Sequence, residues 1–179
     1  MTSLLRLPQG AHQALLAHLL PAESDEEQAA FVYARQVTSS VGDWLLEHVD
    51  HELLGAADFE IQHSAHIELA DATRARVIKR AHDLEACLVE WHSHPYPCPA
   101  AFSPSDRAGL REFVPHVRWR LRGRPYAAVV VAPGGSFDAL AWDGEDTEPR
   151  QLDALEVEGQ LLRPTELTLK HWSRNHGWY

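Results

Sequence analysis

The chain of 179 residues has an ordinary globular share of hydrophobic residues, 45%, and a formal net charge of -10 with its histidines neutral. We expect a single domain over residues 1–179, with residues 158–179 as a C-terminal tail to which the sequence assigns no role. Because a nucleic-acid backbone is bound by clustered Lys and Arg, so acidic a chain is not expected to bind nucleic acid.

Neither a membrane segment nor a disulfide framework is expected. No stretch approaches the ~20 apolar residues of a membrane span. The apolar run over residues 14–20 is broken by His18, which favours a helix over a signal peptide. The two cysteines, Cys87 and Cys98, are too few for a cysteine framework and are typical of free thiols in a reducing compartment. These features predict a cytoplasmic protein that does not contact a membrane.

The first part of the chain predicts a strand, a helix and three further strands. Residues 4–7 form the first strand, and Pro8 opens a helix that Pro21 closes. The apolar side chains of this helix fall on one face, at Ala11, Leu15, Leu16, Leu19 and Leu20. After an acidic connection, apolar and β-branched residues predict strands over residues 29–37, 44–51 and 59–69.

The rest of the chain alternates helices with apolar strands. Helices are expected over residues 71–84 and 103–114, the second being stopped or kinked by Pro115. Apolar runs predict buried strands over residues 86–91 and 126–132, and a Pro-Gly-Gly turn returns the chain over residues 137–142. A charged loop (144–150) and a last strand (152–157) follow. The fold class predicted is α/β (α+β), a mixed central sheet flanked by helices.

The most informative stretch is Trp91-His92-Ser93-His94-Pro95, which ends an apolar strand and is followed after seven residues by Ser103-Pro104-Ser105-Asp106. Histidines two positions apart on an extended segment point to the same side and can share one ion. The next helix would bring its first carboxylate beside them. Two His and one Asp leave the fourth position of a zinc ion to water, as in catalytic zinc sites. The pattern therefore predicts a metal centre.

Structural alternatives exist for parts of this pattern. Ser103, Pro104 and Asp106 also make a complete helix cap, with Ser before the first turn and an acid three residues later. The residues flanking the histidines, Trp91 and Tyr96, are typical of packing, and Cys98 has no basic neighbour that would activate it as a nucleophile.

Two other histidine pairs are weaker candidates. His48 and His51 lie in an expected strand without an identifiable third ligand. His63 and His66 would point to opposite faces of a continuous strand. Neither pair is expected to bind a metal.

The motif resembles the JAMM signature of the JAB1/MPN metallopeptidases, His-x-His-Pro, seven residues, Ser-x-x-Asp. That family also carries a glutamate that opens a strand in the pattern Glu-x-x-Gly-x-hydrophobic-x-Gly. Residues 27–34 are similar, with Glu27 in place and with Ala30 and Ala34 where glycines are usual; Glu26 and Glu23 are the alternatives. The resemblance covers residues 4–142 and is closest to the stand-alone prokaryotic type.

The resemblance implies a JAB/MPN-like, cytidine-deaminase-like three-layer domain and a zinc-dependent isopeptidase or peptidase. His92, His94 and Asp106 would hold Zn²⁺, Glu27 would move protons as general base and acid, and Ser103 would donate a hydrogen bond to the oxyanion. The substrate would be the bond after the C-terminal tail of ubiquitin or a ubiquitin-like protein. Activating- and conjugating-enzyme-like partners, including those of phage defence, are implied in the same way.

Alternatives stay open at this point. The peptidase could process a sulfur-carrier protein instead, or the domain could be a catalytically inactive scaffold or binding module; the second is typical of family members that lack the ligands. RadC-type relatives usually carry glycine between the histidines and the serine, and residues 96–102 contain none.

Overall fold

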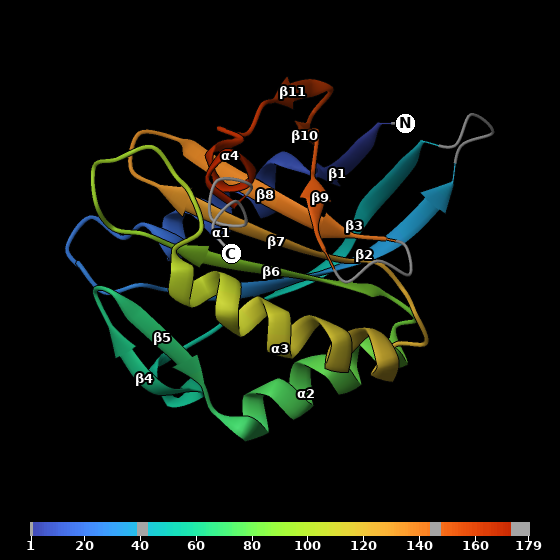
Figure 1. Cartoon of the computed structure of the whole chain (residues 1–179), viewed down its shortest axis with the longest axis horizontal. Helices are drawn as coiled ribbons and strands as arrows, with labels where there is room; N and C mark the ends of the chain where they lie inside the picture. Colours follow the sequence, from blue (N-terminus) through green and yellow to red (C-terminus); the bar gives the residue numbers. More distant parts are fainter. Residues whose placement is uncertain (1, 39–42, 144–147, 173–179) are drawn as a thin grey trace, which may run out of the picture.

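The structure, a computed structural model, describes residues 2–38, 43–143 and 148–172. In these ranges a nine-stranded mixed sheet curls through the molecule with helices against both faces (Figure 1), which confirms the predicted fold class. In spatial order the strands are β11 (Gln160–Leu162), β10 (Ala154–Val157), β1 (Ser3–Leu7), β3 (Trp44–Leu53), β2 (Ala29–Thr38), β6 (Cys87–Ser93), β7 (Tyr126–Ala132), β8 (Ser136–Trp142) and β9 (Arg150–Gln151).

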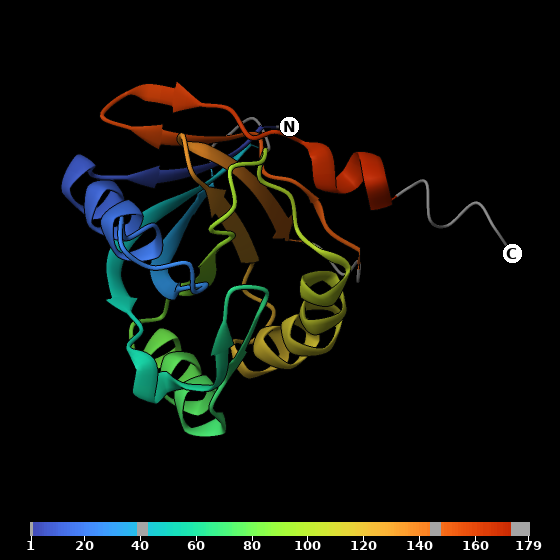
Figure 2. The same cartoon turned by 90° about the vertical axis from the view of Figure 1, so that its left-hand side faces the viewer.

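The helices divide between the two faces of the sheet. Helix α1 (Gln9–Leu19) covers one face, and α2 (Asp71–Asp83) and α3 (Pro104–Arg120) cover the other (Figure 2). Because successive side chains of a strand point to opposite faces, each inner strand contributes to both cores. In β2, Phe31 and Tyr33 pack toward α2 and α3, whereas Val32 and Ala34 pack on the side of α1.

The central strands β6 and β7 explain why the site can be rigid. Every residue of β7 is buried, and β6 pairs parallel with β7 and antiparallel with β2. The register aligns Ala29, His92, Val130 and Asp138 in one row across β2, β6, β7 and β8. A row of registered residues shares one face of a sheet, so His92 faces the core that α2 and α3 cover.

Two strand predictions need correction. Residues 59–69 form a two-stranded hairpin, β4 (Phe59–His63) and β5 (His66–Leu69), and not one strand. The reversal at Ser64 and Ala65 was missed because these residues are weak turn signals. Strand β6 also runs on to Ser93, so His92 lies inside the strand and not beyond it, because β7 continues to pair there.

Helix α3 continues through Pro115 to Arg120, so of the two outcomes expected at Pro115, a stop or a kink, the stop is wrong, and the helix does not end at residue 114. A proline inside a helix costs about 3 kcal/mol because it removes one hydrogen bond and crowds the preceding turn. Here the residue four positions earlier, Arg111, is exposed, so the crowding falls on the outer side of the helix and not in the core. Burial of Val114 and Val117 on the inner face offsets the cost.

The C-terminal part also differs from expectation. The strand expected over residues 152–157 is β10, which begins at Ala154, and residues 150–151 form the short β9. Within the expected charged loop, residues 144–147 lie outside the described ranges. The tail contributes β11 and helix α4 (Leu167–Trp172), and its residues 173–179 are not described.

Two absences concern the described residues alone. None of their helices combines the length and apolar composition that crossing a membrane requires. Both cysteines are free, Cys87 buried and Cys98 exposed.

At the turn between β7 and β8, Gly134 and Gly135 have φ values of 83° and 80°, which glycine adopts without strain.

Candidate active site

The end of β6 presents His92 and His94 on one side of the sheet. Alternation along the strand turns Ser93 the other way, where its hydroxyl accepts the backbone N–H of Gln28 (2.9 Å). The His94 N–H donates to the carbonyl of Val131 (2.8 Å), so the backbone stays extended past the last strand residue. The His92 side chain is 3% exposed, and its ring meets the edge of Phe102 at 5.5 Å between centroids.

The N-terminus of α3 brings Asp106 to the two histidines. Ser103 is the N-cap residue: its hydroxyl accepts the Asp106 N–H (3.1 Å), and Asp106 Oδ2 accepts the Ser103 N–H (2.7 Å). Pro104 occupies the first helical position, where its missing N–H has no cost. The capping alternative is therefore confirmed, and it coexists with a ligand position because the cap fixes the carboxylate at the site.

Three potential ligand atoms converge on one point. Asp106 Oδ2 lies 3.1 Å from His94 Nε2 and 3.5 Å from His92 Nε2. Ligand atoms about 2.1 Å from a tetrahedral zinc lie about 3.4 Å apart. Among the described residues, His92, His94 and Asp106 form the group of His, Cys and acidic side chains close enough to share an ion. Their geometry is compatible with the predicted metal site.

The electrostatics favour a cation at the same point. The Nε2 atom of His92 is buried without a hydrogen-bond partner, an unfavourable position unless something else binds it. Burial would lower the pKa of His92, but the carboxylates of Asp106, Glu90 and Glu27 outweigh burial and raise it to about 9. Burial would likewise raise the pKa of Asp106, but both imidazoles outweigh it and hold that pKa well below its usual value. A metal ion would take the place of the proton between these groups.

Glu27 lies two residues before the start of β2 and points into the same space. Its side chain is 5% exposed, and Oε1 lies 3.9 Å from His94 Nε2. Burial raises the pKa of Glu27, and the charges of His92 and His94 oppose the rise. A carboxylate with a raised pKa is suited to taking and returning a proton near neutral pH. The alternatives Glu26 and Glu23 are exposed.

The β4–β5 hairpin holds Glu27 in position. The Glu27 N–H donates to the carbonyl of His63 (3.2 Å), and the Gln62 side-chain amide donates to the carbonyl of Glu27 (3.0 Å). Both backbone groups of Glu27 are therefore fixed by β4. The roles assigned to Glu27 and Ser103 stay predictions, but the structure brings both residues to the site.

Glu90 was missed by the motif analysis. Its Oε1 lies 3.8 Å from His92 Nδ1, and its Oε2 accepts the hydroxyl of Tyr126 (2.7 Å). A carboxylate behind a metal-binding histidine orients the ring and raises its basicity. One signal could have revealed it: Glu90 is the single acidic residue of β6, follows three apolar residues and shares the face of His92.

Of the other residues considered in the sequence, two are histidines of the β4–β5 hairpin and two flank the pair of His92 and His94. His63 and His66 face each other across the hairpin with ring centroids 5.9 Å apart, because the continuous strand that would have turned them to opposite faces does not form. Trp91 is fully buried and packs in the core, as expected. Tyr96 donates to the carbonyl of Ser64 (2.5 Å), which ties the loop after the histidines to the hairpin tip.

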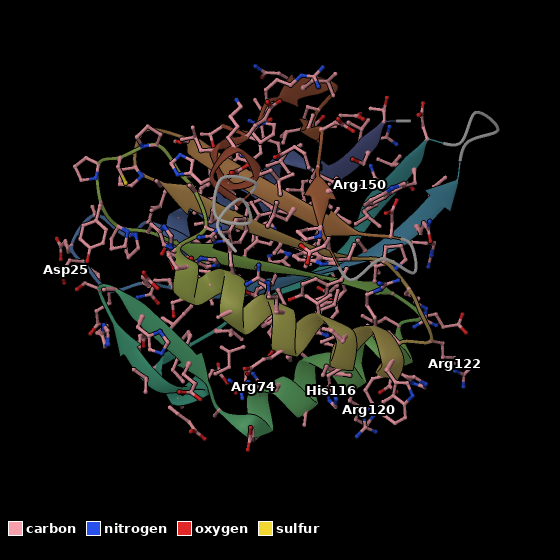
Figure 3. The ribbon with its side chains drawn as sticks, in the orientation of Figure 1. Asp25, Arg74, His116, Arg120, Arg122 and Arg150 are labelled. Atoms are coloured by element: carbon pink, nitrogen blue, oxygen red, sulfur yellow. The ribbon has the colours of Figure 1, made fainter. Side chains whose placement is uncertain are left out.

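A groove of about 1090 Å³ begins at His92 and Asp106. It passes between β5, with Ile67 and Leu69, and the facing sides of α2 and α3. Basic side chains also line the groove, three of which are labelled in Figure 3: Arg74, His116 and Arg120. Such a groove can receive an extended chain beside the metal centre.

A comparison with protein families matches residues 8–143 to the model described as prokaryotic homologs of the JAB domain. No curated protein matches the chain. Among solved structures, the chain is similar to the solution structure of a protein from Salinibacter ruber, with 20% identity over 94% of each chain and a TM-score of 0.40. The family match covers both histidines, Asp106, Ser103 and Glu27. The chain belongs to the family of prokaryotic homologues of the JAB domain, a family that includes hydrolases.

Proposed function

We propose that this protein is a zinc-dependent isopeptidase that hydrolyses the bond after the C-terminal tail of ubiquitin or a ubiquitin-like protein. The observation that carries the proposal is the convergence of Asp106 Oδ2 with the Nε2 atoms of His92 and His94, beside the buried carboxylate of Glu27. A structural metal site is usually closed by four protein ligands, whereas three ligands with an adjacent acid are typical of hydrolysis.

The donor set fits zinc, because two imidazoles and one carboxylate suit a borderline cation and the buried His92 nitrogen lacks a partner. Bound there, zinc would supply Lewis-acid polarisation of the scissile carbonyl and would lower the pKa of a water molecule toward 7. Glu90 would keep the His92 ring in the orientation that leaves Nε2 toward the site.

The chain's own residues perform the proton transfers. Glu27 accepts a proton from the attacking water on its carboxylate and then delivers it to the leaving amine nitrogen. Ser103 uses an oxygen lone pair in the helix cap, so its O–H hydrogen can donate to the oxyanion. One such donor contributes up to about 3 kcal/mol of transition-state stabilisation.

The groove supports an extended peptide tail as substrate. An edge strand such as β5 offers backbone groups to an extended chain, which accounts for binding without a deep side-chain pocket. We infer that the tail lies between β5 and α3 and that the scissile bond reaches His92 and Asp106. The bond is an isopeptide or peptide bond to the amine of the next residue.

The proposal is tested with zinc-loaded protein and a panel of ubiquitin-like and sulfur-carrier proteins carrying a C-terminal extension or a lysine conjugate. We expect cleavage after the tail, detected by mass spectrometry, that stops when a chelator is added and returns with zinc. Cleavage confined to sulfur-carrier fusions would assign the protein to their processing. A zinc-loaded protein that binds a tail without cutting it would support the scaffold alternative instead.

A further inference from the structure

We propose that Thr168, in the C-terminal helix α4, is a positioning residue for the metal centre, because it holds the loop between the metal ligands in place. The inference rests on the proposed function, since it concerns how the same site is kept in its geometry. Thr168 is 1% exposed although it lies in a short helix near the end of the described chain. It also lies outside the region 8–143 that matches the family.

Thr168 is anchored to the sheet by a buried carboxylate. Its N–H and its hydroxyl both donate to Asp138 Oδ2, at 2.9 and 2.6 Å. The other oxygen of Asp138 accepts the Ala139 N–H (2.9 Å) and the Gln151 side-chain amide (3.0 Å). Asp138 is fully buried, so these bonds compensate a charge that burial would otherwise penalise strongly.

The same hydroxyl reaches the loop that carries the site. Thr168 Oγ1 accepts the backbone N–H of Phe102 (2.9 Å), the residue that precedes the N-cap Ser103. Two residues earlier the loop is held again: the Thr165 hydroxyl donates to the carbonyl of Ala100 (2.6 Å), and the Ala100 N–H donates to the Ser136 hydroxyl (2.8 Å). The C-terminal segment thus fixes the loop at two points.

These contacts act on the ligands by a short route. Phe102 packs its ring against His92, and its backbone leads directly into the cap that orients Asp106. Asp138 itself lies in the registered row that runs through Val130 to His92. The hydroxyl of Thr168 therefore ties Asp138 of β8 to Phe102, the loop residue that contacts the His92 ring and leads into the cap that orients Asp106.

The test measures metal binding, so it needs no substrate. Full-length protein freed of metal is titrated with Co²⁺, whose visible spectrum reports the coordination geometry. The variants are Thr168→Val, which keeps the shape and removes the hydroxyl, and Thr168→Ser, which keeps the hydroxyl. We expect Thr168→Val to weaken Co²⁺ binding about tenfold, as loss of an outer partner does, and to change the spectrum. Thr168→Ser should restore both.

A matched control separates positioning from general stability. Thr73, in α2, is equally buried, and its hydroxyl donates to Asp58 Oδ1 (3.0 Å), which does not belong to the loop between the metal ligands. Thr73→Val should lower the melting temperature without changing Co²⁺ affinity or spectrum. If Thr168→Val does not fold, Thr165→Val tests the second anchor of the same loop, with Thr165→Ser as its rescue, and a smaller loss of Co²⁺ affinity is expected.

The outcomes are distinguishable. Wild-type protein that binds Co²⁺ together with a folded Thr168→Val that binds it equally well, with the same spectrum, overturns the inference and leaves the proposed function standing. Wild-type protein that binds no Co²⁺ overturns the zinc-dependent function and this inference with it. A loss in Thr168→Val that Thr168→Ser does not restore shows that the hydroxyl is not responsible and also overturns the inference.

Discussion

Two histidine pairs in this molecule have nearly the same distance between their rings, but their ring nitrogens have different partners. The ring centroids of His92 and His94 are 5.2 Å apart, and those of His48 and His51 are 5.3 Å apart. In the second pair the rings satisfy each other, because His48 Nε2 lies 3.1 Å from His51 Nδ1. In the first pair, both Nε2 atoms turn toward Asp106.

The pKa values follow from this difference. Burial and the neighbouring His51 lower the pKa of His48. The nearby Asp50 does not form a third ligand, because it accepts the backbone N–H of His51 and pairs with Arg80. At the other pair, carboxylates raise the pKa of His92 to about 9 against the effect of burial. Proximity of two imidazoles therefore does not by itself assemble a group that could share an ion; a carboxylate must also converge on both rings.

The largest expected effect comes from removing a ligand. His92→Ala should abolish stoichiometric zinc binding, with a loss of affinity beyond the 10- to 100-fold that an outer partner causes. His48→Ala, the matched change in the other pair, should leave the zinc content unchanged. Metal analysis after dialysis measures both. Retention of one zinc per chain in His92→Ala would contradict the role of His92 as a ligand and the contrast with His48.

The next largest effect is expected from removing the carboxylate of Glu27, which lies beside the ligands. Glu27→Gln keeps the shape and removes the proton acceptor, so hydrolysis should fall by roughly 10²- to 10⁴-fold while zinc stays bound. Turnover is measured on the fusion that wild-type protein cleaves, and zinc content on the same preparation. Unchanged turnover would remove Glu27 from the mechanism.

Ser103→Ala should have a mixed effect because Ser103 serves both helix and site. Turnover is expected to fall by up to about 10²- to 10³-fold through loss of the oxyanion donor, and stability by about 1 kcal/mol through loss of the cap. Ser103→Asn restores a cap without the hydroxyl donor. Denaturant unfolding and kinetics on both variants separate the two roles, and full activity in Ser103→Ala would exclude the donor role.

A pH series sharpens the contrast further. In the metal-free protein the raised pKa of His92 stabilises the fold fully below its ordinary value of 6.5, and this contribution is lost as pH rises through about 9. The lowered pKa of Asp106 stabilises the fold above its ordinary value of 3.8, and that part is lost as pH falls. Zinc requires neutral imidazole. The gap in melting temperature between zinc-loaded and metal-free protein should widen from about pH 6 to about pH 9; a constant gap would contradict this.

The smallest effect concerns the other pair. Because the pKa of His48 is lowered, folding disfavours its protonation, and this penalty appears as pH falls below its ordinary value of 6.5. His48→Gln removes the titrating group, so its melting temperature should drop less than that of wild type on acidification in metal-free buffer. An equal drop would show that the pair carries no such penalty.

Much of the site was predictable because its residues are close in the chain. His92 and His94 share a face through strand alternation, and Ser103 with Asp106 is a local cap signal. Glu27 was reached only through the family pattern, since a lone glutamate in an acidic connection resembles any solvated charge. Glu90 and Thr168 were not identified, because their importance depends on neighbours that the sheet supplies.

In the fold, too, features that depend on neighbouring residues in the chain were predictable, and features that depend on distant contacts were not. Apolar periodicity determined the strands and helices, down to β7 and α1 with boundaries within a residue or two. The hairpin reversal at Ser64, the passage of α3 through Pro115 and the docking of α4 were decided by tertiary structure. Each depends on a contact between distant segments: the pairing of β4 with β5, the burial of Val114 and Val117, and the buried bridge from Asp138 to Thr168. Such contacts join residues that are far apart in the chain. The free energy that they contribute therefore cannot be read from the local sequence pattern.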